Sequence, residues 1–436
     1  MQAFWNKNSR YRRVPSDMEN VDKQDYKDHS TSRTVSSITN KCSRRYRNVT
    51  LFIFVVTIVS ILFFLLFRGN RENLENYTNM VKNYTSKAMN LEAQTLAVAK
   101  SEVKMALEKY LNSIDPHEIY PDDVNMIKPH HIRVIGAMGD SLTIGSRAEN
   151  IVGQRQRYPG NAFFTGMDFE VDRHLTVYNI FRIIAEKTGN KLFGGSTGID
   201  YGENTGLNVA IGGMKSDDIL RQAKELVSRI KANKEINIEN DWKLVSLWIG
   251  TNDVGTLGYR LEDPIPVDEY KSHIEKGLLY LKENLPRTIV SIVGMFPAQL
   301  LQEAQSILKN GKRARTVENQ KKLDDLSDGY RNVSYDFQNN EHFNSNDFTV
   351  VVQPFATEYT DSYRDEHGKY NPTFYASDLF HLSKFGHAVL AKHYWLNLFE
   401  PVGEKTKRAD LGDTKPKIYE LNEKNCLIKT VGNSKM

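Results

Sequence analysis

The sequence predicts an α/β domain built on a doubly wound parallel sheet, preceded by one membrane-spanning helix and a helical stem. Between residues 118 and 405, short apolar runs alternate with segments of helical periodicity, as in strands joined by crossover helices. Most of these runs are apolar without a break, which is expected of strands covered on both faces. Upstream, residues 49–67 form an uncharged apolar segment of 19 residues, about the length that crosses a bilayer as a helix.

The N-terminal residues 1–48 form a polar tail that we expect to be disordered and cytoplasmic. Residues 1–50 carry 11 Lys and Arg and 5 Asp and Glu, whereas the rest of the chain carries 47 and 49. The basic character therefore belongs to the tail, and the large domain lacks the electrostatic footprint of a nucleic-acid binder. Cys42 is either an S-acylation site beside the apolar segment or an unmodified thiol, and Cys426 is given no role.

The apolar segment 49–67 has two other interpretations. A cleaved signal peptide fits poorly, because the run begins nearly fifty residues in and exceeds the usual apolar length of about 7–15 residues. A helix buried in a soluble domain would need apolar surroundings on every side. Four cations crowd the N-terminal flank, at Lys41, Arg44, Arg45 and Arg47. The positive-inside rule therefore predicts a type II signal anchor, with the large domain outside the cell or in the lumen.

Glycosylation sequons agree with this orientation. Asn76, Asn83 and Asn332 each begin a sequon on the side of the membrane where glycosylation occurs. We expect these three to be modified. Asn48 also begins a sequon, but it lies at the cytoplasmic edge of the membrane, so we expect it to be unmodified.

Residues 68–117 are predicted to form a helical stem. Apolar residues from Met80 to Leu111 recur roughly at helical spacing among good helix formers. The segment stops at Asp115-Pro116. A solvated spacer helix is the favoured interpretation, and a helix docked on the domain or a short coiled-coil seam also fits.

Five strands and four helices are predicted in the domain 118–405. The strand candidates are 132–138, 207–211, 244–249, 288–295 and 348–353. The helix candidates are 216–232, 267–284, 298–309 and 312–331. The Lys-rich residues 406–436 are expected to form a flexible tail.

Polar residues and glycines follow the carboxyl ends of these strands. Ser141, Gly213, Asn252 and Pro354 each come after a predicted strand. Doubly wound sheets bind their ligands outside this edge. The sequence therefore predicts that Ser141, Gly213 and Asn252 share one site.

The chemistry that these residues support is acyl transfer by an activated serine. Ser141 is the candidate nucleophile, which needs a base to remove its proton. His381 is the candidate base, and Asp378, three residues earlier, can hold the imidazole in one tautomer. The backbone N–H groups of Ser141 and Gly213 and the amide of Asn252 are candidate oxyanion donors.

Each motif also has a plainer interpretation when taken alone. Gly139-Asp140-Ser141 is also a common sequence in turns, and Asp378 of the Asp-x-x-His pair could be the cap of a helix. No His, Cys, Asp or Glu cluster has convincing metal-ligand spacing, because His130 and His131 are adjacent and look like loop residues. We therefore predict no metal and no other cofactor.

Taken in order, the motifs resemble the four sequence blocks of the SGNH (GDSL) hydrolases, and more narrowly their phospholipase B-like branch. The matching stretches are Gly139-Asp140-Ser141-Leu142, Gly213 after Asn208-Val209-Ala210, Gly250-Thr251-Asn252-Asp253 and Asp378-x-x-His381. The resemblance covers residues 118–405 and implies a three-layer α/β/α sandwich of flavodoxin-like topology. It also implies a Ser141, Asp378, His381 triad, an oxyanion hole of Ser141, Gly213 and Asn252, and no metal.

The chain departs from the branch in three places. The branch commonly carries cysteines after the Asn-Asp pair and inside the Asp-x-x-His block, where this chain has Val254-Gly255 and Leu379. Both partners are missing together, so the resemblance implies a lost disulfide. Residues 166–170 lack the glycine-rich pattern expected there, which bears on substrate preference. The apolar anchor lies at the N-terminus, whereas comparable relatives are secreted or anchored near the C-terminus.

The predicted function is a membrane-anchored serine esterase, and the resemblance implies phospholipids or lysophospholipids as substrates. Two alternatives remain. One is the same chemistry on other substrates, as in an O-deacetylase of carbohydrates or small molecules or an acyltransferase. The other is a catalytically silent ectodomain that binds a partner or lipid.

Overall fold

The computed structural model describes ten stretches of the chain. They are residues 102–115, 117–149, 156–198, 205–254, 264–297, 317–358, 374–376, 378, 380–411 and 417–434. The chain divides into two compact units, 1–87 and 88–436, and every described residue belongs to the second. The predicted anchor 49–67, the sequons of Asn76 and Asn83 and the predicted helix 298–309 lie outside the described residues. Among the helices that are described, none has the length and apolar character that a bilayer span requires.

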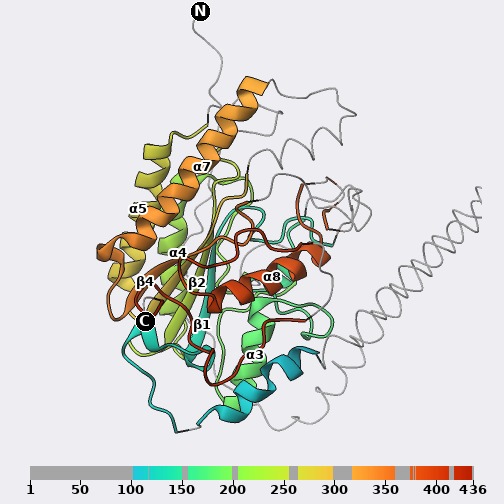
Figure 1. Ribbon diagram of the computed structural model, residues 1–436, viewed down its shortest axis with the longest axis vertical. Coiled ribbons are helices and arrows are strands. Elements are labelled where there is room, and N and C mark those ends of the chain that lie inside the picture. Colours follow the sequence, from blue (N-terminus) through green and yellow to red (C-terminus); the bar gives the residue numbers. More distant parts are fainter. Residues whose placement is uncertain are drawn as a thin grey trace, which may run out of the picture. The chain divides into compact units, whose positions relative to one another are not determined.

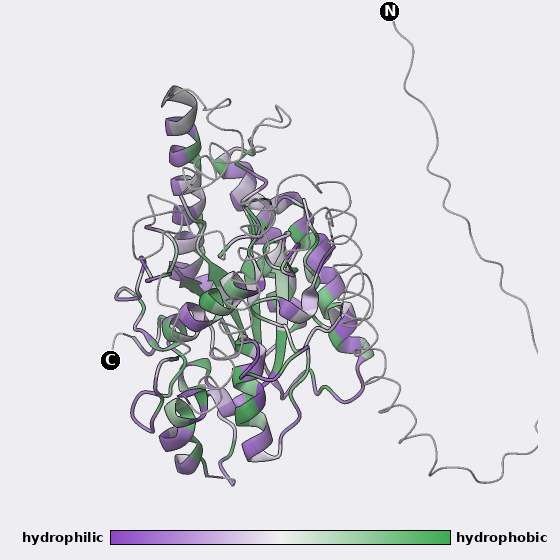
Figure 2. Cartoon of the chain, turned by 90° about the vertical axis from the view of Figure 1, so that its right-hand side faces the viewer, coloured by the Kyte–Doolittle hydropathy of each residue, from purple (hydrophilic) through white to green (hydrophobic). Residues whose placement is uncertain are grey.

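A parallel sheet of four strands forms the centre of the described domain (Figure 1). Its strands, in spatial order, are β1 (Ile132–Gly139), β2 (Trp242–Trp248), β3 (Thr288–Val293) and β4 (Phe348–Gln353). Nearly every strand residue is buried, as unbroken apolar runs predict for a sheet with both faces covered. The apolar strands occupy the middle of the domain in the hydropathy colouring (Figure 2). The prediction of a parallel α/β sheet is confirmed.

The predicted strand 207–211 is an extended segment along the outer edge of β1, not a regular strand. The Ala137 N–H donates to the carbonyl of Leu207 at 3.0 Å, and the Val209 N–H donates back to the Ala137 carbonyl at 2.9 Å. The Ile211 N–H then donates to the Gly139 carbonyl at 3.2 Å. The chain therefore turns to one side of β1 with this segment and to the other side with β2. β1 is thus the strand at which the winding direction reverses, where doubly wound folds place their sites.

Helices cover both faces of the sheet. The helices are α3 (Val177–Thr188), α4 (Ile219–Ala232), α5 (Val267–Asn284), α7 (Val317–Asn339) and α8 (Lys384–Phe399). Helices α4, α5 and α7 pack together on one face, and α3 and α8 pack together on the other (Figure 1). The predicted helix 267–284 is confirmed, and the predicted helix 216–232 is a 3-10 turn, η5 (Ser216–Asp218), followed by α4. α7 ends later than the predicted helix 312–331, of which residues 312–316 lie outside the described residues, and α3 and α8 were not predicted.

The described end of the stem packs on the domain. Residues 102–113 are helical, and Val103, Leu107 and Tyr110 are fully buried. Of the three interpretations of the stem, the docked helix therefore holds for this part, and the favoured solvated spacer is wrong there. Apolar residues spaced three and four apart give this helix a buried stripe.

Residues 417–434 also pack on the domain, so the prediction of a flexible tail is wrong for them. Ile418, Leu421 and Ile428 are buried. The Leu421 N–H donates to the Ala106 carbonyl of the stem helix at 3.0 Å, and the Ile428 N–H donates to the Ile127 carbonyl at 2.8 Å. The Lys-rich composition concealed these apolar residues, which cover the stem helix.

Candidate active site

The carboxyl end of β1 is shaped by Gly139. Its φ is 152°, and a Cβ there would lie 2.2 Å from the carbonyl oxygen of Trp248 on β2. Only glycine permits this close approach. Gln222 of α4 holds the same residue, because its side chain accepts the Gly139 N–H at 2.8 Å and donates to the Gly139 carbonyl at 2.9 Å. The backbone is therefore fixed at the point where Ser141 follows.

Ser141 begins a helical turn directly after β1. The Asp140 carbonyl accepts hydrogen bonds from Thr143 and Ile144 N–H at 3.2 and 3.1 Å, and the Ser141 carbonyl accepts one from Ser146 N–H at 3.0 Å. Only 9% of the Ser141 surface is exposed. A strand that ends in a tight turn in this way holds a serine at the edge of the sheet.

The structure brings Gly213 and Asn252 to the Ser141 turn. Gly139 pairs with Trp248, so β1 and β2 end at the same level and the residues after them are neighbours. The Asn252 amide donates to the Met214 carbonyl at 2.9 Å and to Asp140 Oδ2 at 3.3 Å. A Cβ on Gly212 would lie 3.7 Å from the Ser141 Cβ, so the glycine loop passes directly beside the serine.

Two neighbouring N–H groups remain available at this edge. Gly213 has a positive φ of 82°, and no atom lies within 4 Å of the position that a Cβ would take. Within the described part of the chain, the backbone N–H groups of Ser141 and Gly213 donate to no acceptor. They are therefore able to donate to a substrate oxygen.

Two buried acids lie behind the turn, and sequence reasoning missed their role. Burial raises the pKa of Asp140 to about 7, and the nearby Asp253 carboxylate adds to the rise. Burial also raises the pKa of Asp253, although the Ser216 N–H donates to both of its oxygens at 2.9 and 3.1 Å. A carboxyl group that is partly protonated near neutral pH repels a developing oxyanion less than a full charge would.

Asp378 and His381 form the predicted pair. His381 Nδ1 lies 2.6 Å from Asp378 Oδ2. The other oxygen, Oδ1, accepts the backbone N–H of Phe380 at 3.2 Å and that of His381 at 3.0 Å. Burial opposes the charged carboxylate, yet the His381 hydrogen bonds and the charge of Arg147 lower the pKa of Asp378 to about 2. The carboxylate is thus ionised and fixed against the imidazole.

The segment that follows Ser141 contacts this pair. Arg147 Nε lies 3.0 Å from Asp378 Oδ2, and the Lys384 N–H at the start of α8 donates to the Ala148 carbonyl at 2.7 Å. The segment 141–148 therefore begins at Ser141 and contacts Asp378 and the start of α8 near its other end. Sequence reasoning missed Arg147, because nothing in a local motif marks an arginine that pairs with a distant carboxylate.

Two further histidines lie behind the site. His387 of α8 is fully buried, and its Nδ1 accepts the Phe163 N–H at 3.2 Å. His174 is also buried and lies 2.8 Å from the Asn161 carbonyl through Nε2. Burial lowers the pKa of each to about 3, so both are neutral near pH 7. They pack and support the site without adding charge to it.

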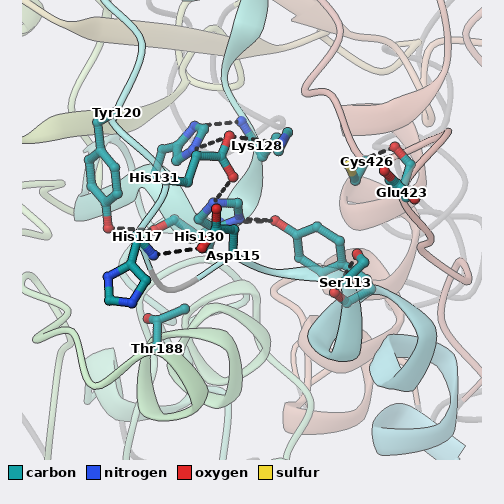
Figure 3. A network of polar contacts seen from close by, with 12 residues as sticks. Ser113, Asp115, His117, Tyr120, Lys128, His130, His131, Thr188, Glu423 and Cys426 are labelled. Atoms are coloured by element: carbon teal, nitrogen blue, oxygen red, sulfur yellow. Dashed lines mark hydrogen bonds and ion pairs between the residues drawn. The ribbon is translucent and has the colours of Figure 1, made fainter.

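A cluster of possible metal ligands lies elsewhere, where the linker after the stem meets η2 (Pro129–His131). Figure 3 shows His130, His131 and Lys128 in one polar network. Glu118 Oε2 lies 3.1 Å from His130 Nε2, and Glu118 Oε1 lies 3.4 Å from His131 Nε2 and 2.8 Å from Lys128 Nζ. His130 and His131 were expected to be loop residues, but both are buried, and Glu118 completes a group that sequence spacing did not reveal.

The protonation of this cluster does not fit a metal. His131 Nδ1 accepts the Lys128 backbone N–H at 3.1 Å, so the neutral ring carries its proton on Nε2, the atom that faces Glu118. A metal would need that lone pair, and the Lys128 ammonium already neutralises the carboxylate. Glu118, His130, His131 and Lys128 instead form a hydrogen-bonded ion cluster that ties the linker to the domain.

The remaining predicted sites fall in α7 and the C-terminal segment. Asn332 is exposed in α7, whereas the Ser334 of its sequon is buried and donates its hydroxyl to the Tyr330 carbonyl at 3.1 Å. Glycosylation of Asn332 stays a prediction. Cys426 is buried, and burial raises the pKa of its thiol.

Comparison with known proteins identifies the family to which this chain belongs. A family model described as GDSL-like lipase/acylhydrolase matches residues 135–394. The chain is 33% identical over 334 residues to human "Phospholipase B1, membrane-associated", covering 72% of this chain and 22% of that protein. It is 33% identical over 341 residues to the rat protein of the same name, covering 74% and 23%. The chain thus spans less than a quarter of the length of these relatives.

Solved structures are more distant. A putative GDSL-like lipase from Parabacteroides merdae aligns at 17% identity and a TM-score of 0.32, covering 62% of this chain and 96% of that one. An acetyl xylan esterase from Geobacillus stearothermophilus aligns at 17% identity and a TM-score of 0.34, covering 60% and 94%.

Proposed function

The chain belongs to the GDSL-like lipase/acylhydrolase family, and from this premise we propose that it is a serine esterase acting on phospholipids or lysophospholipids. The observation that carries the proposal is the Asp378–His381 pair, bonded to the segment that begins at Ser141. The substrate class follows from the name of the curated relatives, phospholipase B1.

In the proposed mechanism, Ser141 Oγ attacks the carbonyl carbon of the acyl ester while His381 Nε2 takes the hydroxyl proton. Asp378 accepts the Nδ1–H at 2.6 Å and stabilises the imidazolium that forms. His381 then returns the proton to the leaving alcohol as the ester C–O bond breaks. Water, activated by the same imidazole, releases the fatty acid and restores Ser141.

The proposed oxyanion hole consists of the backbone N–H groups of Ser141 and Gly213 and the amide of Asn252. The Asn252 amide is held against Met214 at 2.9 Å, and its longer 3.3 Å contact with Asp140 is the one that it would give up to a substrate oxygen. Three neutral donors fixed before the reaction stabilise charge that appears only in the transition state.

We also propose that residues 49–67 anchor the enzyme as a type II membrane protein, with the esterase domain extracellular or lumenal. The curated relatives carry the words "membrane-associated" in their name, which agrees with this assignment. Glycosylation at Asn76, Asn83 and Asn332 belongs to the same proposal, because only the outer side of the membrane is glycosylated.

A substrate panel tests the function. The purified 436-residue chain is assayed against a diacyl phospholipid, a lysophospholipid, a long-chain carboxylic ester, p-nitrophenyl acetate and acetylated xylan, alongside Ser141→Ala. We expect fatty acid release from the phospholipids and long-chain ester and loss of at least about a thousandfold in the variant. Ser146→Ala, which removes a hydroxyl from the same turn, is the matched control and should retain activity. Release of acetate alone would contradict the substrate class.

A further inference from the structure

We propose that Arg147 is a positioning residue that sets the working pH range of the His381 base by sharing the Asp378 carboxylate with it. The inference rests on the proposed esterase function. It concerns a residue outside the triad and outside the oxyanion hole.

The shared atom is Asp378 Oδ2. Arg147 Nε lies 3.0 Å from this oxygen, and His381 Nδ1 lies 2.6 Å from the same oxygen. The second carboxylate oxygen is already occupied by two backbone N–H groups, those of Phe380 and His381. The orientation of Asp378 is therefore secured without Arg147. What Arg147 adds uniquely is a positive charge on the oxygen that must stabilise the imidazolium.

The backbone at Arg147 indicates that its placement is enforced. Its φ is 62°, and among the described residues it shares a positive φ with only one other residue that is not glycine, Arg287. A side chain in this region is strained, and such strain persists where the surroundings hold it. Here the Arg147 N–H donates to the Gln156 carbonyl at 2.9 Å, and the Ala148 carbonyl accepts the Lys384 N–H at 2.7 Å. Glycine would adopt this φ without strain, yet the position carries a guanidinium.

Among the described residues, Arg147 is the cation in direct contact with the Asp378–His381 pair. His387 faces the pair from α8, and His174 lies beyond it in the loop before α3; burial lowers the pKa of both, so both are neutral. Lys384, also on α8, places its Nζ 3.5 Å from the centre of the Phe169 ring. Phe380 meets the His381 ring edge to face, with the ring centres 4.8 Å apart.

The guanidinium acts in two ways on the imidazolium that forms at His381 during the reaction. It repels the positive charge of the imidazolium, and it competes for the carboxylate oxygen that would stabilise that charge. Removing the guanidinium should therefore stabilise the imidazolium, and the pH dependence of the reaction measures this change. The Arg147 and Asp378 side chains are 21% and 24% exposed, so solvent screens the effect only in part.

The test is the pH dependence of kcat/KM for the 436-residue chain on p-nitrophenyl butyrate, an uncharged ester. In Arg147→Gln, which keeps a hydrogen-bond donor but loses the charge, the acid limb should move to higher pH by about 0.5–1 unit. Arg147→Lys keeps the charge and should hold the limb within about 0.3 unit of the original. Arg182→Gln, which removes a similarly exposed arginine from a pair with Glu170, is the matched control and should leave the limb in place.

A purely structural arginine would give a different result. If Arg147→Gln lowers kcat at every pH while the acid limb stays fixed, Arg147 only joins two segments and the proposal is wrong. Should Arg147→Gln fail to fold, Arg147→Gly decides, because glycine adopts the φ of 62° without strain and also removes the charge, so its acid limb should move to higher pH. An Arg147→Gly limb that stays in place would overturn the proposal. Failure of the esterase function itself is recognised separately, by Ser141→Ala retaining activity.

Discussion

At the scale of single residues, the proposed site contains two kinds of constrained position: one where an added atom would clash, and one where a charged group is held by several donors. Gly139 is the first kind, because a Cβ would meet the Trp248 carbonyl at 2.2 Å. Asp378 is the second kind, with both oxygens occupied by donors. The sequence predicted Ser141, Gly213, Asn252, Asp378 and His381 as site candidates because each lies in a short local motif. It could not predict Arg147 or Glu118, whose partners come close only through the fold.

Gly139→Ala should destabilise the protein by about 2–4 kcal/mol, since it adds a backbone clash to an unfavourable φ. The matched control is Gly189→Ala, because Gly189 has a positive φ of 69° at the end of α3 but no atom within 4 Å of a Cβ. That substitution should cost only about 1 kcal/mol. Denaturant unfolding measures both. Equal costs would show that the close approach to Trp248 does not constrain the end of β1.

At the scale of elements, buried strands were easier to predict than buried helices. The strands are continuous apolar runs that end in glycine or polar residues, and four of the five predictions correspond to regular strands. Helix α8 is buried on almost every side, and its buried residues include polar ones such as Lys392 and Asn397, so it lacks the one-sided apolar pattern that marks a helix. Its start was readable only from the Ser383 cap, which accepts the Gly386 N–H. α3 carried similar signals, in the Thr176 cap and Gly189.

The docked stem helix gives a prediction at this scale. Leu107→Ala removes a fully buried side chain and should lower the free energy of unfolding by about 2–4 kcal/mol. Met105→Ala lies two residues away on the same helix, but Met105 is 60% exposed, so it should change stability by less than about 0.5 kcal/mol. Both are measured by denaturant unfolding of the 436-residue chain. A Leu107→Ala variant as stable as Met105→Ala would mean that the helix is not docked in solution.

At the scale of the whole molecule, buried ionisable groups couple stability to pH. Burial lowers the pKa of His131, His174 and His387 to about 3 each, below the value of about 6.5 for an unfolded histidine. The unfolded chain therefore binds more protons between these values, and stability falls as pH decreases through that range. Burial of Asp140 acts in the opposite direction, because its raised pKa of about 7 lets the folded state bind a proton first.

The contribution of His131 can be measured by comparing how the free energy of unfolding depends on pH in different variants. His131→Asn keeps an acceptor for the Lys128 N–H but removes the titrating ring. Between pH 5 and 6, the free energy of unfolding should depend on pH less steeply in this variant, by about 1 kcal/mol per pH unit. His117→Asn, which replaces an exposed imidazole, is measured alongside as the control for the substitution itself. Denaturant unfolding across this pH range measures the slopes, and identical slopes for all three proteins would contradict the assignment of a buried neutral His131.

The central claim is that Ser141 is an activated nucleophile, and covalent labelling tests it most directly. The purified chain is treated with a fluorophosphonate probe, and the modified peptide is identified by mass spectrometry, in parallel with Ser141→Ala and Ser146→Ala. The account predicts one label on Ser141, lost in Ser141→Ala and kept in Ser146→Ala. Folded protein that takes up no label, or that is labelled equally in Ser141→Ala, would contradict the account and leave a binding domain with the fold of an esterase.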